Sequence, residues 1–311
     1  MIRKCISITS SGMMGCYCAG VLDFLVKEFP ESLKDFYFHG ASSGALLAGL
    51  YKLTLNPPSS LLRAFTDFYN KKRKSTKDEP AYLDLVDSIK EFGTSLSHEK
   101  SLQDQKLMLD RVNDGRLYIH VARPKMQFLP LGMFGLSLPL PPALEGESLY
   151  HWDSLEDFFE TLAQSCAIPF KTCTWDRAMA SGMDGGFTDR CPQLTDDLLP
   201  IWNKESKTPF FVPMPLPSAL PNAMSTFVLC ENRWRQNKFN LFHVLDMSFD
   251  TKKQNDLIEM GLADAAENRG DIEQFIQYKG KLPSKTQAPP ELLSAYPQPL
   301  RHLEPHPHPV Q

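Results

Sequence analysis

The chain has 311 residues, of which 42% are hydrophobic and 23% charged, a size that suits one large domain with extensions. Its formal net charge is only -4, so the charge balance gives no sign of a nucleic-acid partner. The seven cysteines are an odd number without a CxxC pair, which is not typical of a disulfide framework and favours a reducing, intracellular compartment.

The N-terminal segment MIRKCISITS starts with basic residues, but its apolar run is too short for a signal peptide. No stretch of the sequence approaches the roughly 18 apolar residues of a membrane-spanning helix. We therefore expect a cytoplasmic protein that is soluble or peripheral on a membrane surface. Within this segment, residues 5–9 alternate between apolar and small polar side chains, which predicts a first strand.

A glycine turn follows the first strand and precedes a predicted helix. It is not a Walker phosphate loop, because Cys16 and Tyr17 stand where lysine and Ser or Thr are needed. It is not a dinucleotide-binding GxGxxG either, because Ser10 replaces the first glycine. Backbone amides presented just after a strand are what the tetrahedral oxyanion of an ester requires. The candidate oxyanion-binding residues are Gly12, Met13, Met14 and Gly15.

The second motif is a GxSxG turn between a run of aromatic residues and an apolar helix. Its members are Gly40, Ser42 and Gly44, and this arrangement predicts a nucleophile elbow. The serine of an elbow occupies a sharp, strained strand-to-helix turn, so the positions two before and two after it must be nearly free of side chains. Ser42 is therefore the candidate nucleophile, and His39 is interpreted as a strand-end residue.

Together the segments 12–22 (GMMGCYCAGVL) and 40–46 (GASSGAL) resemble the start of a patatin-like phospholipase domain. That family places an oxyanion loop and a GVL-containing helix shortly before its GxSxG serine, whereas ordinary α/β-hydrolases have several strands before theirs. The loop lacks an arginine or lysine before its last glycine, which is more similar to the adiponutrin and adipose triglyceride lipase branch. The resemblance implies a doubly wound α/β fold in three layers, with a mostly parallel sheet flanked by helices.

Further helices are predicted from about residue 59 to 70, 83 to 92 and 99 to 112, followed by a strand at 117–122. His120 is interpreted as a packed residue of that strand rather than a ligand. The basic run at 71–74 (KKRK) has two interpretations: a solvated helix end that complements the helix dipole, or a contact with anionic lipid headgroups.

Residues 123–149 combine apolar side chains with five prolines, which excludes a long helix. We predict a proline-broken loop here. Two placements stay open: the loop packs across the edge of the sheet, or it forms a lid or lipid-facing surface near the site.

The third motif is the turn Asp184-Gly185-Gly186, which alone is typical of a plain turn. It follows a predicted helix from 154 to 166 whose ending, QSCAIP, is similar to the helix-to-proline turn before the DG[GA] aspartate of patatin-like domains. The resemblance covers about residues 5–195. It implies a Ser42–Asp184 dyad in which the aspartate is the base without a histidine, an acyl-serine intermediate, and no metal or other cofactor.

One competing arrangement is a triad with His243, which follows Asp184 in the Ser, Asp, His order of α/β-hydrolases. Its segment, 239–247, is apolar and lacks the loop character that a catalytic histidine usually has.

The sequence divides into three parts. Residues 1–200 are the patatin-like acyl hydrolase domain, and 201–280 are a C-terminal extension packed on it, with a strand at 226–230 and an amphipathic helix at 257–268. Residues 281–311 are rich in proline and histidine and predict a disordered tail.

The expected function is that of a lipid acyl hydrolase, of the phospholipase A or acylglycerol lipase type. Its partners are a lipid ester substrate and the surface of a membrane or lipid droplet, without nucleic acid. Two other classes stay open. The departures Ser10, Ser11 and Met14 in the oxyanion loop allow a non-catalytic lipid-binding or scaffolding protein on the same fold. An acyl-CoA-independent acyltransferase would use the same acyl-enzyme with an alcohol acceptor.

Overall fold

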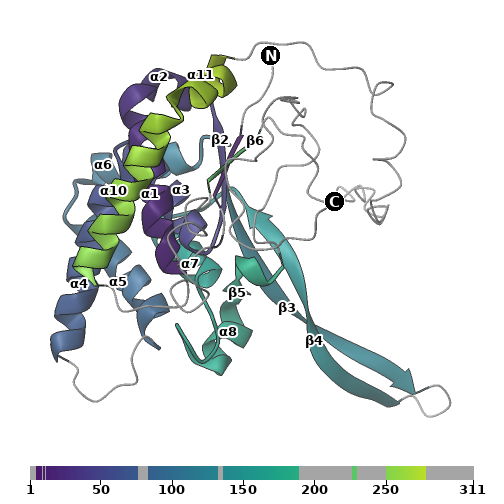
Figure 1. Cartoon of the computed structure of the whole chain (residues 1–311). Coiled ribbons are helices and arrows are strands. Elements are labelled where there is room, and N and C mark those ends of the chain that lie inside the picture. Colours follow the sequence, from purple (N-terminus) through teal and green to yellow (C-terminus); the bar gives the residue numbers. More distant parts are fainter. Residues whose placement is uncertain are drawn as a thin grey trace, which may run out of the picture.

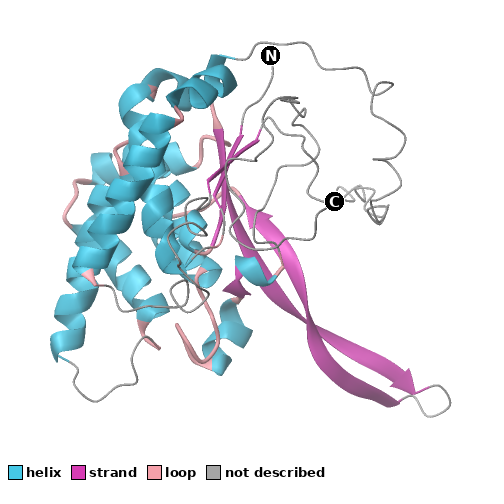
Figure 2. Ribbon diagram, in the orientation of Figure 1, coloured by secondary structure: helices cyan, strands magenta, loops and turns pink. Residues whose placement is uncertain are grey.

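A computed structural model of the chain describes residues 5–8, 10, 12–75, 83–131, 136–188, 226–229 and 250–277, which form a six-stranded sheet and the helices that cover it (Figures 1 and 2). The strand order is β4-β3-β2-β1-β6, and β5 pairs with β3. The pairings β6–β1, β1–β2 and β2–β3 are parallel, whereas β4 and β5 run antiparallel to β3. The strands are β1 (Cys5–Ile8), β2 (Tyr37–Ala41), β3 (Leu117–Leu131), β4 (Leu136–Leu149), β5 (Met183–Asp184) and β6 (Thr226–Leu229).

This arrangement confirms the mixed α/β class with a mostly parallel sheet flanked by helices. The three-layer, doubly wound arrangement stays a prediction. The described helical elements are η1 (Gly12–Met14), α1 (Gly15–Glu28), α2 (Pro30–Leu33), α3 (Ser43–Thr54), α4 (Pro58–Ser75), α5 (Leu85–His98), α6 (Leu102–Val112), α7 (Leu155–Ser165), α8 (Trp175–Ser181), η3 (Gly185–Phe187), α10 (Thr251–Glu267) and α11 (Arg269–Gln277).

Helices α1 and α3 form the centre of the helical layer. Every residue of α1 from Gly15 to Val26 is buried, and α3 is buried from Gly44 to Leu53. A helix that is apolar on all sides needs neighbours on all sides. Helix α10 supplies one of them, because Gly261 lies so close to the Tyr17 carbonyl of α1 that a Cβ would clash there. Figure 1 shows α10 lying along α1.

The two faces of the sheet differ in chemistry. The register places Ile6, Phe38 and Ile119 on the face that packs against α3, where Phe38 contacts Tyr51 with ring centroids 4.8 Å apart. Because side chains alternate along a strand, His39 and His120 lie on the opposite face. The predicted site motifs stand at the ends of strands β1 and β2, beside α1 and α3.

The prediction of a loop at 123–149 was wrong, because residues 123–131 and 136–149 lie in the two paired strands β3 and β4. Strands β3 and β4 pair from Ile119–Leu149 to Leu131–Leu136, with one irregularity near Lys125. Figure 1 shows the hairpin extending away from the rest of the fold. Proline has no backbone N–H group to donate to a neighbouring strand, so it is tolerated in edge strands and at bulges.

The basic run at 71–74 lies in the last turns of α4. Lys72 forms an ion pair with Glu91 of α5 at 2.8 Å, and its Nζ lies 3.8 Å from Asp84 just before that helix. This part of the run therefore joins α4 to α5.

Candidate active site

Ser42 occupies the turn between β2 and α3 in a strained backbone conformation. Its φ is 55° and its ψ is -128°, a combination that non-glycine residues rarely adopt. The side chain makes no capping bond to α3, so its hydroxyl is not committed to the helix end. A Cβ at Gly40 would clash with the Gly44 carbonyl oxygen, which explains the glycine two positions before the serine. This is the geometry of a nucleophile elbow.

The register of the sheet brings Asp184 to the same turn. Strand β4 pairs with β3 at Val121 along one edge of β3. Because β5 also pairs with Val121, β5 lies along the other edge of β3, in line with β2. Ala41 pairs with His120, and Asp184 pairs with the next residue, Val121. Successive residues of a strand are about 3.3 Å apart. Asp184 thus occupies the position at which β2 would continue if it did not turn at Ser42.

Contacts of Gly185 confirm that the two motifs meet. A Cβ at Gly185 would lie 3.2 Å from the Cβ of Ala41 and would clash with the His120 carbonyl oxygen. Ala41 is the neighbour of Ser42 in the chain, and Gly185 is the neighbour of Asp184. The approach leaves no room for a side chain at Gly185, which accounts for the first glycine after the aspartate.

Asp184 is only 3% exposed, and its carboxylate is held by hydrogen bonds. Oδ1 accepts a bond from the Gly186 amide at 2.8 Å and one from the Ser10 hydroxyl at 3.3 Å. A Cβ at Gly186 would clash with Ser10 Oγ. Ser10, which replaces the first glycine of the dinucleotide-binding pattern, is therefore a contact of the candidate base. The sequence alone did not reveal this contact.

The predicted oxyanion loop lies beside the elbow. Gly12 has a φ of 56°, which favours glycine, and η1 leads directly into α1. A Cβ at Gly15 would lie 2.8 Å from the Cβ of Ser43, so the loop and the start of α3 are in close contact. The first amides of a helix lack partners within the helix. Met14 is buried, and Gly12, Met13 and Gly15 line a pocket together with Ser42.

The Ser42 amide itself has a different partner, because it donates to Ser165 Oγ at 2.9 Å. Ser165 in turn donates to the His120 carbonyl oxygen at 2.7 Å. The Ser42 amide is therefore committed to Ser165, and the candidate donors to an oxyanion remain the predicted residues of the loop.

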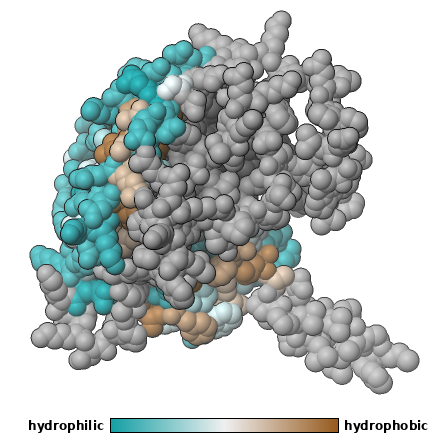
Figure 3. Space-filling view, in the orientation of Figure 1, coloured by the Kyte–Doolittle hydropathy of each residue, from teal (hydrophilic) through white to brown (hydrophobic). Residues whose placement is uncertain are grey.

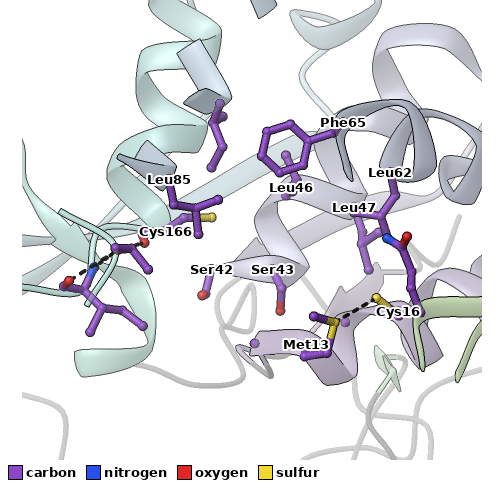
Figure 4. A pocket seen from close by; sticks show the side chains of 16 residues that line it. Met13, Cys16, Ser42, Ser43, Leu46, Leu47, Leu62, Phe65, Leu85 and Cys166 are labelled. Atoms are coloured by element: carbon purple, nitrogen blue, oxygen red, sulfur yellow. Dashed lines mark hydrogen bonds between the residues drawn. The ribbon is translucent and has the colours of Figure 1, made fainter. Parts of the chain in front are cut away.

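The pocket at Ser42 has a volume of about 640 Å³, its open part included. Figure 4 shows Ser42 and Ser43 between the Met13 and Cys16 side chains on one side and Leu85 on the other. Most of the wall is apolar and comes from three helices and the segment after α7: Leu46, Leu47, Leu62, Phe65, Leu85, Ile89 and Ile168. A wall of this kind suits a hydrocarbon chain.

The two cysteines of the pocket are poor nucleophiles. Burial raises the pKa of the Cys16 thiol to about 12 and holds the pKa of Cys166 well above its usual value. A thiol that stays protonated at neutral pH does not react as a thiolate. The Ser42 hydroxyl on its strained turn is the better candidate.

No histidine is among the described residues that line the pocket. His39 and His120 lie on the opposite face of the sheet, where both rings bond to Ser148 Oγ. His243, the candidate third member of a triad, lies outside the described residues, as do Ser11 and the predicted tail at 281–311. The described geometry contains the serine and the aspartate of the predicted dyad.

Burial, with a smaller contribution from nearby His120, lowers the pKa of His39 from 6.5 to about 3. Because the unfolded chain takes up this proton near pH 6.5 and the folded protein does not, stability should fall as the pH drops from 6.5 towards 3. We expect wild type to lose about 2 kcal/mol more than His39→Gln between pH 7 and pH 5, as measured by urea unfolding. Parallel losses in the two proteins would contradict the depressed pKa.

Comparison with known proteins adds no family to these observations: no family model matches the chain, and no curated protein matches it. Within the described ranges, no helix combines the length and the apolar character needed to cross a membrane. The same residues contain no group of three or more His, Cys, Asp or Glu side chains placed to hold a metal ion.

Proposed function

We propose that this chain is a patatin-like serine hydrolase that cleaves carboxylic esters of lipids, with Ser42 as nucleophile and Asp184 as base. The observation that carries the proposal is the strained serine at φ 55° with the buried aspartate in the adjacent register position. The apolar pocket that contains Ser42 supports a substrate with an acyl chain. The proposal includes the doubly wound, three-layer fold and the cytoplasmic location expected from the sequence.

The reaction follows from these groups. Ser42 Oγ attacks the carbonyl carbon of the ester while Asp184 accepts its proton, and the amides of Gly12, Met13 and Met14 bind the oxyanion. The tetrahedral intermediate then expels the alcohol, which takes the proton from Asp184, and an acyl-serine remains. Water attacks the acyl-serine with Asp184 again as base, which releases the fatty acid and restores the Ser42 hydroxyl.

The test combines a fluorophosphonate probe with ester substrates. We expect the purified full chain to be labelled at Ser42, as located by peptide mass spectrometry, and to release fatty acid from phospholipid or acylglycerol emulsions. A folded protein that neither labels nor hydrolyses would support the lipid-binding or scaffolding alternative. Transfer of the acyl group to an added glycerolipid in place of water would support the acyltransferase.

We further propose that the protein works at the surface of a membrane or lipid droplet. Phe170 and Trp175 are 76% and 43% exposed, and their rings stack with centroids 5.7 Å apart. Phe170 lies within the short turn that carries the pocket residues Ile168 and Thr172, and Trp175 begins α8 just after this turn. Figure 3 shows hydrophobic residues on the lower side of the molecule, where Figure 1 places α8. Aromatic side chains next to a pocket mouth suit a lipid–water interface.

Phe170→Ser is expected to weaken binding to phosphatidylcholine vesicles about tenfold, because a buried aromatic ring contributes roughly 1.5 to 3 kcal/mol. Flotation with vesicles measures the binding. Leu102→Ser is the matched control, since Leu102 is 84% exposed on α6, outside the pocket wall. An equal loss in the control would exclude a specific docking surface at Phe170.

A further inference from the structure

Four polar side chains form a hydrogen-bonded chain on the face of the sheet opposite α3. His39 Nε2 lies 2.9 Å from Ser148 Oγ, which lies 3.1 Å from His120 Nδ1. His120 Nε2 lies 3.0 Å from Thr188 Oγ1, and this hydroxyl donates to the Gly185 carbonyl oxygen at 3.2 Å. Both imidazoles are buried. The chain therefore runs from β2 across β4 and β3 to the turn that carries Asp184.

The last bond fixes the direction of all the others. A carbonyl oxygen only accepts, so Thr188 donates its proton to Gly185 and must accept one from His120 Nε2. A neutral imidazole with its proton on Nε2 has an accepting Nδ1, so Ser148 donates to His120. Ser148 then accepts from His39 Nε2. With neutral imidazoles, both histidines thus carry the proton on Nε2, and the lowered pKa of His39 agrees with a neutral ring at that position.

His120 is linked to both halves of the candidate dyad through intermediate residues. Its imidazole holds Thr188 and, through it, the peptide next to Asp184. Its carbonyl oxygen accepts from Ser165, whose hydroxyl accepts the Ser42 amide. The same residue also stands beside Ala41 in the register of the sheet. One strand residue thus connects the turn of the nucleophile with the turn of the base.

We propose that His120 and Thr188 are positioning residues, which hold the Gly185 peptide and thereby keep the Asp184 carboxylate beside Ser42. This inference rests on the proposed hydrolase function. It assigns a catalytic contribution to side chains that do not touch substrate. A conformational error of about 1 Å in such a turn lowers a reaction rate by up to about 100-fold.

The test replaces the hydroxyl of Thr188 and keeps its shape. Thr188→Val should lower kcat for a soluble short-chain ester by about 10- to 100-fold, leave KM within about twofold, and slow fluorophosphonate labelling by the same factor as kcat. Thr188→Ser should restore most of kcat, because it returns the hydroxyl. Thr54→Val is the matched control, since its hydroxyl bonds to the Leu50 carbonyl at the end of α3. An unchanged kcat in Thr188→Val, or failure of Thr188→Ser to restore it, would overturn the positioning role.

A second measurement separates this inference from the proposed function. Nitrogen NMR of the full chain at neutral pH should show His39 and His120 as neutral rings with the proton on Nε2, and His39→Gln and His120→Gln identify the two signals. A proton on Nδ1 of either ring would overturn the directed chain, whether or not the protein is active. An inactive wild type with the expected tautomers would instead refute the hydrolase and the positioning role while leaving the hydrogen-bonded chain in place.

Discussion

Ser42→Ala is expected to abolish fluorophosphonate labelling and to lower ester hydrolysis by about 10⁴-fold or more, because the acyl-enzyme cannot form without the hydroxyl. Alanine keeps the Cβ and hence the strained backbone at φ 55°. The loss would therefore reflect the missing oxygen and not a different turn. Labelling followed by gel fluorescence measures the first effect, and fatty-acid release measures the second.

Ser42→Gly tests the strain itself. Glycine adopts positive φ without a steric penalty, so this inactive variant should be more stable to urea than Ser42→Ala by about 1 kcal/mol or more. Ser43→Ala is the matched control for the nucleophile, because Ser43 lies in the same pocket and has an ordinary helical position. Labelling that persists in Ser42→Ala and disappears in Ser43→Ala would move the nucleophile to Ser43.

The sequence alone predicts the elbow and its order in the chain because the constraints there are local. The strain at Ser42 and the crowding at Gly40 involve residues within a few positions of each other, so glycine spacing records them. The glycines after Asp184 record a close approach to His120 and to Ser10, and they were visible as a motif for the same reason. Such positions leave a mark in the sequence because only glycine fits.

The hydrogen bonds of Ser165 and Thr188, which support the two turns, cannot be recognised from a sequence pattern. Ser165 meets the Ser42 amide across 123 positions of sequence, and Thr188 meets His120 across 68. Serine and threonine are common in helices and turns for many reasons, so neither residue stands out in its segment. The only hint was the similarity of the QSCAIP helix ending to that of patatin-like domains. Long-range partners of this kind require the fold before they can be recognised.

The prediction of a loop at 123–149 was wrong for a different reason. Prolines such as Pro130 and Pro139 oppose both helix and central strand, and the sequence does not show which edges of β3 and β4 have neighbours. At positions that need no N–H donor, proline is compatible with an extended strand. The proline-rich segment that was predicted as a loop thus contains the two strands of a β-ribbon.

Asp184→Asn is expected to lower kcat by about 10³-fold while the fold persists. Catalysis by a positioned base contributes roughly 10²- to 10⁴-fold. Asparagine retains a side-chain oxygen that accepts the Gly186 amide and the Ser10 hydroxyl, so the turn keeps its contacts. It has no basic oxygen to take the Ser42 proton. The kinetic constants and the rate of fluorophosphonate labelling measure the effect, and thermal unfolding checks the fold.

Asp264→Asn provides the matched control for a buried carboxylate. Asp264 is also 3% exposed and accepts a bond from Tyr17 at 2.8 Å, but it lies on α10, whereas Asp184 lies on β5 in the register position next to the Ser42 turn. This variant should lose stability and keep kcat. If Asp184→Asn kept full activity while His243→Ala lost it, the base would be a histidine and the two-residue site would be wrong. The opposite result would assign the proton transfer to Asp184 and exclude His243 as the base.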